Sequence, residues 1–141
     1  MPDYQISLSS DPSLNDIQYL GSQLEAYNIE QVGYTDAKRL TLFVRDENGQ
    51  VIGGLTGWTY WDWLAIDLFW LHEVVRGRGY GTKLLRMAEE EAKNRGCKHV
   101  LLDTFSFQAP DFYQRHGYEL FGTLAEFAGK HKRYYFRKVL G

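Results

Sequence analysis

The fold is decided by two neighbouring stretches: Trp63-Leu64-Ala65-Ile66-Asp67-Leu68-Phe69-Trp70-Leu71, and then Arg76-Gly77-Arg78-Gly79-Tyr80-Gly81-Thr82. The first stretch predicts a central strand, because apolar residues at nearly every position are typical of a strand covered on both faces. Residues 80–95 carry an apolar stripe at helical spacing. A glycine-rich loop therefore joins a buried strand to the start of an amphipathic helix.

This loop predicts a binding site for a pyrophosphate. The free backbone N–H groups and the positive dipole end of a helix N-terminus favour an anion, and glycines let a phosphate approach the backbone closely. Arg76 and Arg78 add positive charge. Two commoner phosphate loops do not match. A Walker A loop needs Gly-Lys-Ser/Thr, whereas Gly81 is followed by Thr82 and Lys83, and Thr82 also stands where G-x-G-x-x-G requires its last glycine.

Outward from this unit, strands and helices alternate. We expect strands at residues 4–8, 40–45, 51–60, 63–71, 99–104, 118–124 and 133–139, and helices at residues 11–27, 80–95 and 109–116, with room for a short helix within 28–39. Asp11 and Pro12 indicate the start of the first helix, and Asn48-Gly49 predicts a hairpin turn. Together these elements predict one α/β domain over residues 1–141. Its mixed sheet of six to seven strands is expected to be antiparallel in its N-terminal part.

Composition excludes several classes of protein. The chain has 141 residues, a net charge of −2 and one cysteine, which argue against nucleic-acid binding by bulk charge and against a disulfide scaffold. The single Cys97 is expected in the core or a turn. No secretory signal and no apolar run long enough to span a membrane are visible, so we expect a cytoplasmic protein. The four histidines show no metal-ligand spacing, and no metal is expected.

Two segments resemble one known family. Residues 76–81 match the [Q/R]-x-x-G-x-[G/A] signature of GNAT N-acetyltransferases, and Ala109-Pro110-Asp111-Phe112-Tyr113-Gln114-Arg115-His116-Gly117-Tyr118 is similar to the family's A-x-x-F/L-Y-x-x-x-G-F/Y segment. The order of elements also matches over nearly the whole chain. The resemblance implies a GNAT-like fold with about four helices packed on both faces of the sheet. It also implies acetyl-CoA as the acetyl donor.

The resemblance further implies roles for individual residues. The loop would bind the pyrophosphate of acetyl-CoA, and the backbone at the end of the central strand would pair with the pantetheine arm. Tyr113 would stand near the sulfur as general acid. Many members have Asn seven residues before this Tyr; here Ser106 holds that place and Gln108 is nearby. The implied cofactor-binding residues are Phe69, Trp70, Leu71, Arg76, Gly77, Arg78, Gly79, Tyr80, Gly81, Thr82, Ser106, Gln108 and Tyr113.

Direct acetyl transfer to an amine requires a polarised carbonyl, a stabilised oxyanion and a protonated leaving thiolate. The backbone N–H of Leu71 or His72 is a candidate oxyanion donor. Asp67 interrupts the apolar strand, so it is either the base or amine-orienting group, or a buried hydrogen-bonded carboxylate. Period-two alternation places Asp67 on the same face as Phe69 and Leu71. Glu73 is a weaker candidate for the base.

The acceptor is expected to be a small-molecule amine. We expect its site at the first helical region, the aromatic turn at residues 58–63 and the last two strands, because rings and a carboxylate suit a cationic amine. The basic residues 130–133 predict a solvated hairpin turn, and contact with an anionic substrate or with the 3′-phosphate of CoA is the alternative. A non-catalytic acyl-CoA-binding module and a protein or peptide N-acetyltransferase are the alternatives. Exposed aromatic residues are compatible with a homodimer.

Overall fold

The computed structural model describes residues 2–141, which divide into two compact units between Thr35 and Asp36. The first unit contains one helix, α1 (Leu14–Val32), and no residue of this helix is buried. Ser13 begins it, because its hydroxyl accepts a hydrogen bond from the backbone N–H of Asp16 at 3.1 Å. Gly33 ends it in the left-handed conformation, with φ of 99°.

This unit differs from the sequence prediction in three ways. Residues 4–8 form no strand, the helix begins after Ser13 rather than at Asp11, and it continues through residues 28–32 without a second helix. Its extension has a local cause: residues 28–32 contain no proline or glycine, so nothing stops the helix before Gly33.

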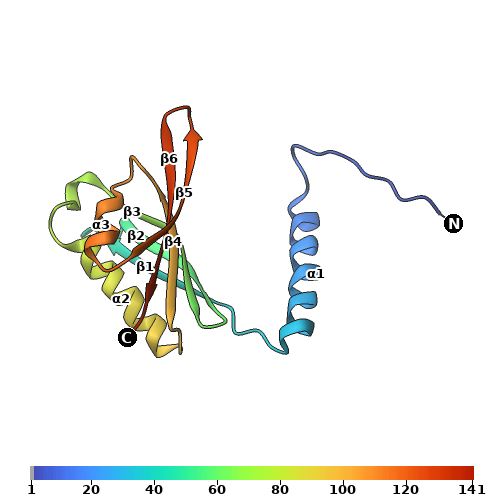
Figure 1. Ribbon diagram of the computed structural model, residues 1–141, viewed down its shortest axis with the longest axis horizontal. Helices are drawn as coiled ribbons and strands as arrows, with labels where there is room; N and C mark the ends of the chain where they lie inside the picture. The colour runs from blue at the N-terminus through green and yellow to red at the C-terminus, as the bar shows by residue number, and fades with distance from the viewer. Residues whose placement is uncertain (1) are drawn as a thin grey trace. The chain divides into compact units, whose positions relative to one another are not determined.

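The second unit is built on one sheet of six strands, shown in Figure 1. They are β1 (Lys38–Arg45), β2 (Val51–Tyr60), β3 (Trp63–Leu71), β4 (His99–Phe105), β5 (Glu119–Phe127) and β6 (His131–Val139). Their order is β1-β2-β3-β4-β6-β5. Only β3 and β4 pair in parallel, through the crossover that contains α2, and the other pairs are antiparallel. The predicted antiparallel beginning with a later parallel pair is confirmed.

Two α-helices, α2 (Tyr80–Asn94) and α3 (Pro110–Arg115), lie on the same face of this sheet (Figure 1). A short 3-10 helix, η1 (Glu73–Val75), precedes α2. The described chain thus has six strands and three α-helices, so the expectation of up to seven strands and about four helices was too high. Within the second unit both α-helices lie on one face of the sheet, because the crossover through α2 and the connection through α3 pass on the same side.

The core lies between the sheet and these two helices. The predicted stripe of α2 is buried there, formed by Leu84, Leu85, Ala88 and Ala92. Its residues Leu85, Ala88 and Ala92 pack in one cluster with side chains of β1 to β4, with Tyr113 of α3 and with Phe136 of β6, which is 1% exposed. Burying this continuous apolar cluster is the main term that stabilises the unit.

A β-bulge interrupts the pairing of β2 with β3. Gly57 pairs with Ile66 while Thr56 pairs with Leu68, so Asp67 is the extra residue on β3. At this point the two backbones approach closely: a Cβ on Gly57 would overlap the carbonyl oxygen of Ala65. The bulge therefore requires glycine on β2.

Replacing that glycine tests the close approach. We expect Gly57→Ala to lower the free energy of unfolding by roughly 1–3 kcal/mol, because the added methyl group must push two backbones apart. Gly122→Ala is the matched control, since a Cβ there meets no atom closer than 3.7 Å. Urea unfolding of both variants measures the difference, and equal midpoints would contradict the proposed steric role.

Candidate active site

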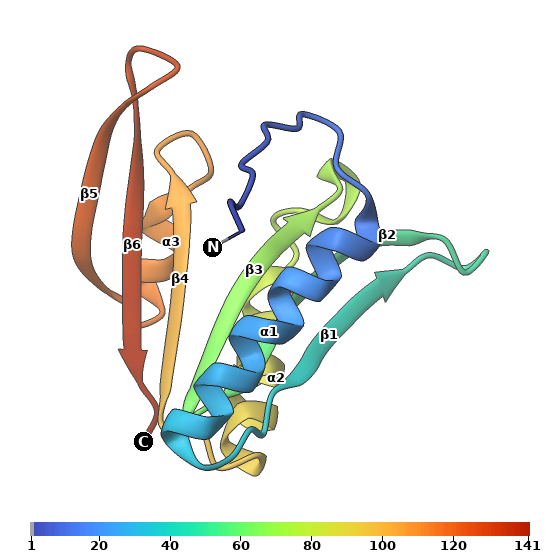
Figure 2. The same cartoon turned by 90° about the vertical axis from the view of Figure 1, so that its right-hand side faces the viewer.

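Strands β3 and β4 diverge at the end where the glycine loop follows β3 (Figure 2). Their pairing runs only from Trp63–His99 to Ile66–Leu102, although β3 stays paired with β2 up to Leu71 and β4 stays paired with β6 up to Phe105. From Asp67 onward, the β3 backbone groups that face β4 have no strand partner. An extended ligand can pair with such groups as an additional strand would.

The direction of these backbone groups follows from one hydrogen bond. The N–H of His72 donates to Ile52 O of β2 at 2.8 Å, so it is not available to a ligand. Because successive residues of a strand direct their N–H groups to opposite sides, the N–H groups of Leu71 and Phe69 point away from β2, toward the divergence. Of the two predicted oxyanion donors, the N–H of Leu71 is therefore available to a ligand, whereas that of His72 is not.

The glycine loop has the backbone that its sequence requires. Gly77 and Gly79 adopt φ of 73° and 83°, a region that costs residues with a Cβ about 1 kcal/mol or more. Gly81 lies in the first turn of α2, and a Cβ there would stand 3.4 Å from the ring of Phe112. The backbone N–H groups of this first turn have no partner inside the helix, so they remain available to an anion.

The two loop arginines are placed differently. The Nε of Arg76 donates to the carbonyl oxygen of Leu71 at 2.9 Å, which fixes its side chain to the end of β3. Arg78 is exposed beside Gly77 and Gly79. Arg76 therefore holds the loop against the end of β3, whereas the exposed Arg78 adds positive charge at the loop itself.

Tyr113 lies on α3 against the diverging part of β3. It is 8% exposed, and its ring contacts those of Phe69 at 6.2 Å and Phe136 at 5.9 Å. Burial, and then the charge of Asp103, raise the pKa of its phenol to about 12. In residues 2–141 no fully buried side-chain N or O atom lacks a hydrogen-bond partner, and the Tyr113 hydroxyl makes no side-chain hydrogen bond, so it reaches solvent as a protonated donor.

Asp67 does not lie on the face predicted for it. It pairs with Arg39 of β1 at 3.7 Å, and the Arg39 guanidinium lies 4.3 Å from the ring of Trp58. These side chains occupy the face opposite α2 and α3, whereas Phe69 packs against Phe112 of α3. The bulge at Asp67 reverses the alternation, which is why a period of two failed here. The carboxylate is half-exposed and ion-paired, not buried.

Ser106 and Gln108 close the end of β4. The side-chain oxygen of Gln108 accepts from the N–H of Phe105 at 2.8 Å and from the hydroxyl of Thr104 at 3.3 Å. The Ser106 hydroxyl oxygen accepts from the N–H of Lys132 on β6 at 3.1 Å. Gln108 therefore keeps its amide NH2 free for a ligand, while Ser106 is engaged with the neighbouring strand.

Sequence reasoning missed one pair of residues at the divergence, Asp103 and Arg133. Two nitrogens of Arg133 contact the same oxygen of Asp103, at 2.7 and 2.8 Å, which leaves the second carboxylate oxygen unpaired. Asp103 follows the last β4 residue paired with β3, and its charge acts on the phenol of Tyr113. The basic run that contains Arg133 was visible in the sequence, but its partner Asp103 lies 30 residues away.

The aromatic turn between β2 and β3 lies at the wrong end of β3 for the predicted acceptor site. Trp63 begins the strand and stacks on His99 at 4.5 Å, whereas the glycine loop follows Leu71 at the other end. Of these residues, Trp58 stays a candidate, because it lies beside Arg39 on the face opposite α2 and α3 and is 37% exposed. The prediction that residues 58–63 line the acceptor site is thus not supported as a whole.

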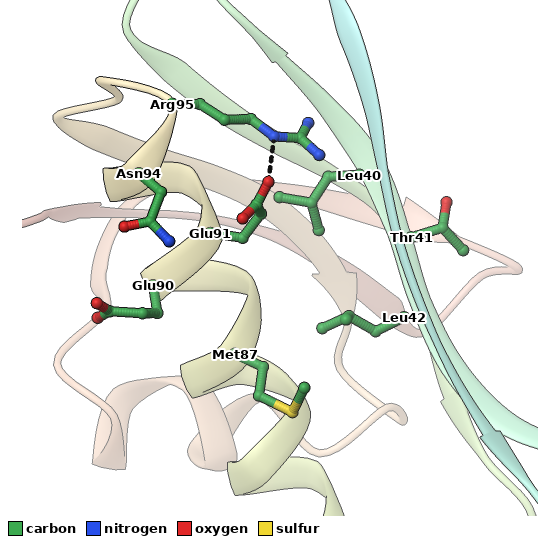
Figure 3. A pocket seen from close by; sticks show the side chains of 8 residues that line it. All are labelled: Leu40, Thr41, Leu42, Met87, Glu90, Glu91, Asn94 and Arg95. Atoms are coloured by element: carbon green, nitrogen blue, oxygen red, sulfur yellow. Dashed lines mark hydrogen bonds and ion pairs between the residues drawn. The ribbon is translucent and has the colours of Figure 1, made fainter.

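A hollow of about 430 Å3 lies elsewhere, between β1 and α2. Figure 3 shows its lining, which includes Met87 and Leu42, and shows the ion pair of Arg95 with Glu91. Arg95 also donates to Thr59 and to the carbonyl oxygen of Arg39, so it ties the end of α2 to the sheet. None of the residues predicted for catalysis or cofactor binding lines this hollow.

Metal ligands, membrane-spanning helices and the single cysteine are the remaining features of residues 2–141 that bear on function. No group of three or more His, Cys, Asp or Glu side chains there could hold a metal ion. In the same range, no helix combines the length and apolar character needed to cross a membrane. Cys97 is buried, and burial raises the pKa of its thiol, which makes it a poor nucleophile.

Known proteins are similar to this chain in sequence and in fold. The model of the acetyltransferase (GNAT) family matches residues 10–118. The chain belongs to this family. An acetyltransferase of Agrobacterium fabrum is 41% identical over 101 residues, which cover 72% of this chain and 74% of the relative. The family shows that the chain is an N-acetyltransferase and that acetyl-CoA is its acetyl donor.

Two more relatives extend the comparison. A crystal structure from Agrobacterium tumefaciens, described as an acetyltransferase, has a TM-score of 0.91 at 32% identity and covers 96% of this chain and 99% of its own. The blasticidin-S acetyltransferase of Streptomyces morookaense is 42% identical over 82 residues, covering 57% of this chain and 60% of that enzyme. The chain thus spans less than two thirds of the latter.

The buried tyrosines predict sensitivity to alkaline pH. The pKa values of Tyr113 and Tyr118 are raised in the fold, whereas an unfolded tyrosine titrates near about 10. Their stabilising contribution is therefore complete below that pH and falls as pH rises through about 12 for Tyr113. Urea unfolding between pH 8 and 11 measures the free energy of unfolding. We expect it to fall less steeply with pH for Tyr113→Phe than for the wild type. Parallel losses would contradict this.

Proposed function

We propose that this acetyltransferase moves the acetyl group of acetyl-CoA directly to a primary amine of a small molecule. One observation carries the proposal: β3 has backbone N–H groups without a strand partner where it diverges from β4, and the ring of Tyr113 contacts that of Phe69 on the same part of β3. The glycine loop continues from the same end of β3 into α2. A thioester lying along β3, with its diphosphate at the loop, would meet both groups.

Each group then has a chemical role. The N–H of Leu71 stabilises the oxyanion that forms when the amine attacks the thioester carbonyl, and one such donor is worth roughly 2.7–4 kcal/mol. As the carbon–sulfur bond breaks, the phenol of Tyr113 gives its proton to the departing thiolate. Its raised pKa keeps the phenol protonated at neutral pH. The amine loses a proton to solvent or to a carboxylate, so no covalent enzyme intermediate is needed.

The amine would approach from the face that α2 and α3 leave open. On that face Asp67 and Asp103 belong to strands on either side of the divergence, and each is paired with one arginine. An ammonium group between them would be attracted by two carboxylates, one of which has a free oxygen. We assign Asp67 and Asp103 to orienting the amine, and Asp67 keeps its candidacy as the base.

The similarity to a blasticidin-S acetyltransferase supports a small molecule as acceptor. The test is thiol release from acetyl-CoA with a panel of free amines that includes blasticidin S, beside short peptides with free N-terminal or lysine amines. We expect turnover of at least one free amine above every peptide. Faster turnover of peptides would reject the small-molecule acceptor. Tyr113→Phe is the matched control, because it should lower turnover at least about tenfold while leaving acetyl-CoA affinity nearly unchanged.

The loop assignment predicts that a carboxylate there abolishes cofactor binding. Gly79→Asp places a negative charge beside the expected diphosphate, and we expect CoA affinity to fall more than about tenfold, which corresponds to about 1.4 kcal/mol. Gly129→Asp is the matched control: both glycines have φ near 82°, and neither has another atom within 4 Å of the added Cβ. Calorimetric titration with CoA measures both variants. Equal affinities would remove the loop from the binding site.

A further inference from the structure

His116 connects the two helices that carry the proposed cofactor site. Its Nε2 lies 3.0 Å from the hydroxyl oxygen of Thr82 in the first turn of α2, and its Nδ1 lies 2.8 Å from the carbonyl oxygen of Phe112 in α3. Its ring also packs on that of Phe112, with centroids 4.5 Å apart. His116 is the C-cap residue of α3, and its contact with Thr82 of α2 is not required for ending that helix.

The two contacts decide where the protons lie. A carbonyl oxygen can only accept, so Nδ1 carries a hydrogen and donates it to Phe112. In the neutral ring Nε2 then has a lone pair, and it accepts the hydroxyl proton of Thr82. In this state the Thr82 oxygen presents only lone pairs toward the loop, which an anionic diphosphate would repel.

Protonation of the ring reverses the second hydrogen bond. Nε2 then carries a hydrogen and donates it to the Thr82 oxygen, and the Thr82 hydroxyl is free to donate its own proton elsewhere. A diphosphate at the start of α2 favours this second state, because it gains a hydrogen bond and an additional nearby positive charge.

We propose that His116 is a positioning residue for acetyl-CoA, which takes up a proton from solvent when the diphosphate binds and thereby turns the Thr82 hydroxyl into a phosphate donor. The inference rests on the proposed placement of acetyl-CoA at the glycine loop. The charged side chains on the adjoining turns are Lys83 and Arg86 of α2 and Asp111 and Arg115 of α3, and all four are exposed. Lys138 of β6 lies beside Gly117 and is paired with Glu89 of α2 at 2.9 Å. Within residues 2–141 no ion pair joins His116 to a carboxylate that would hold it protonated before the ligand arrives.

The test is calorimetric titration of the full chain with CoA near pH 7.5, in two buffers of different ionisation enthalpy. The difference in heat gives the number of protons taken up on binding. We expect His116→Asn and Thr82→Val each to take up fewer protons than the wild type and to bind CoA roughly three- to tenfold more weakly, as loss of one hydrogen bond to a charged group predicts. The double variant should lose no more than either single variant.

Two control variants distinguish the proposed proton uptake at His116 from a purely structural role of the residue. Thr82→Ser keeps the hydroxyl and should restore both affinity and proton uptake. His99→Asn removes a histidine that stacks on Trp63 at the far end of β3 and should behave as the wild type. The proposal would be overturned if His116→Asn took up as many protons as the wild type. It would also be overturned if the losses of CoA affinity in the two single variants added up in the double variant. A wild type that binds no CoA would instead overturn the placement of the cofactor.

Discussion

The site depends on the unequal hydrogen bonding of β3. This strand is paired with β2 along its whole length, but with β4 only from Trp63 to Ile66. If β3 paired with β4 beyond Ile66, its backbone groups there would be hydrogen-bonded to β4 and would not be available to a ligand. The bulge at Asp67 lies where the two strands part, and bulges increase local twist. The close approach of Gly57 makes that bulge possible.

The helices around the divergence form one packed support. Gly81 of α2 lies against Phe112 of α3, and the ring of Phe112 contacts that of Phe69 on β3. At the other end of α2, Arg95 ties the helix to β1 and β2. The glycine loop and Tyr113 therefore sit on elements that contact each other and β3, which favours a fixed distance between the loop and the Tyr113 phenol.

Local patterns predicted most of the second unit well. The bounds of β3 match the prediction, and the apolar stripe of α2 is buried as expected, because both patterns reflect burial against one core. Prediction failed where the outcome depends on longer-range contacts. The alternation rule misplaced Asp67, since nothing in residues 63–71 marks a bulge whose cause is Gly57 on another strand. It also failed at residues 4–8, whose alternation has no strand partner.

The sequence by itself determined the family and named the candidate groups for the chemistry, since glycines with positive φ, a helix start and Tyr113 are local properties of short motifs. Only the tertiary structure decided which of those groups are available. In the folded chain the N–H of His72 donates to β2, and the side chain of Arg76 donates to the carbonyl oxygen of Leu71. The fold also brings Asp103 to Arg133, and Thr82 to His116. Apart from Arg76 with Leu71, these pairings join residues distant in the chain. Their geometry is set by how the sheet twists and how the helices pack on it.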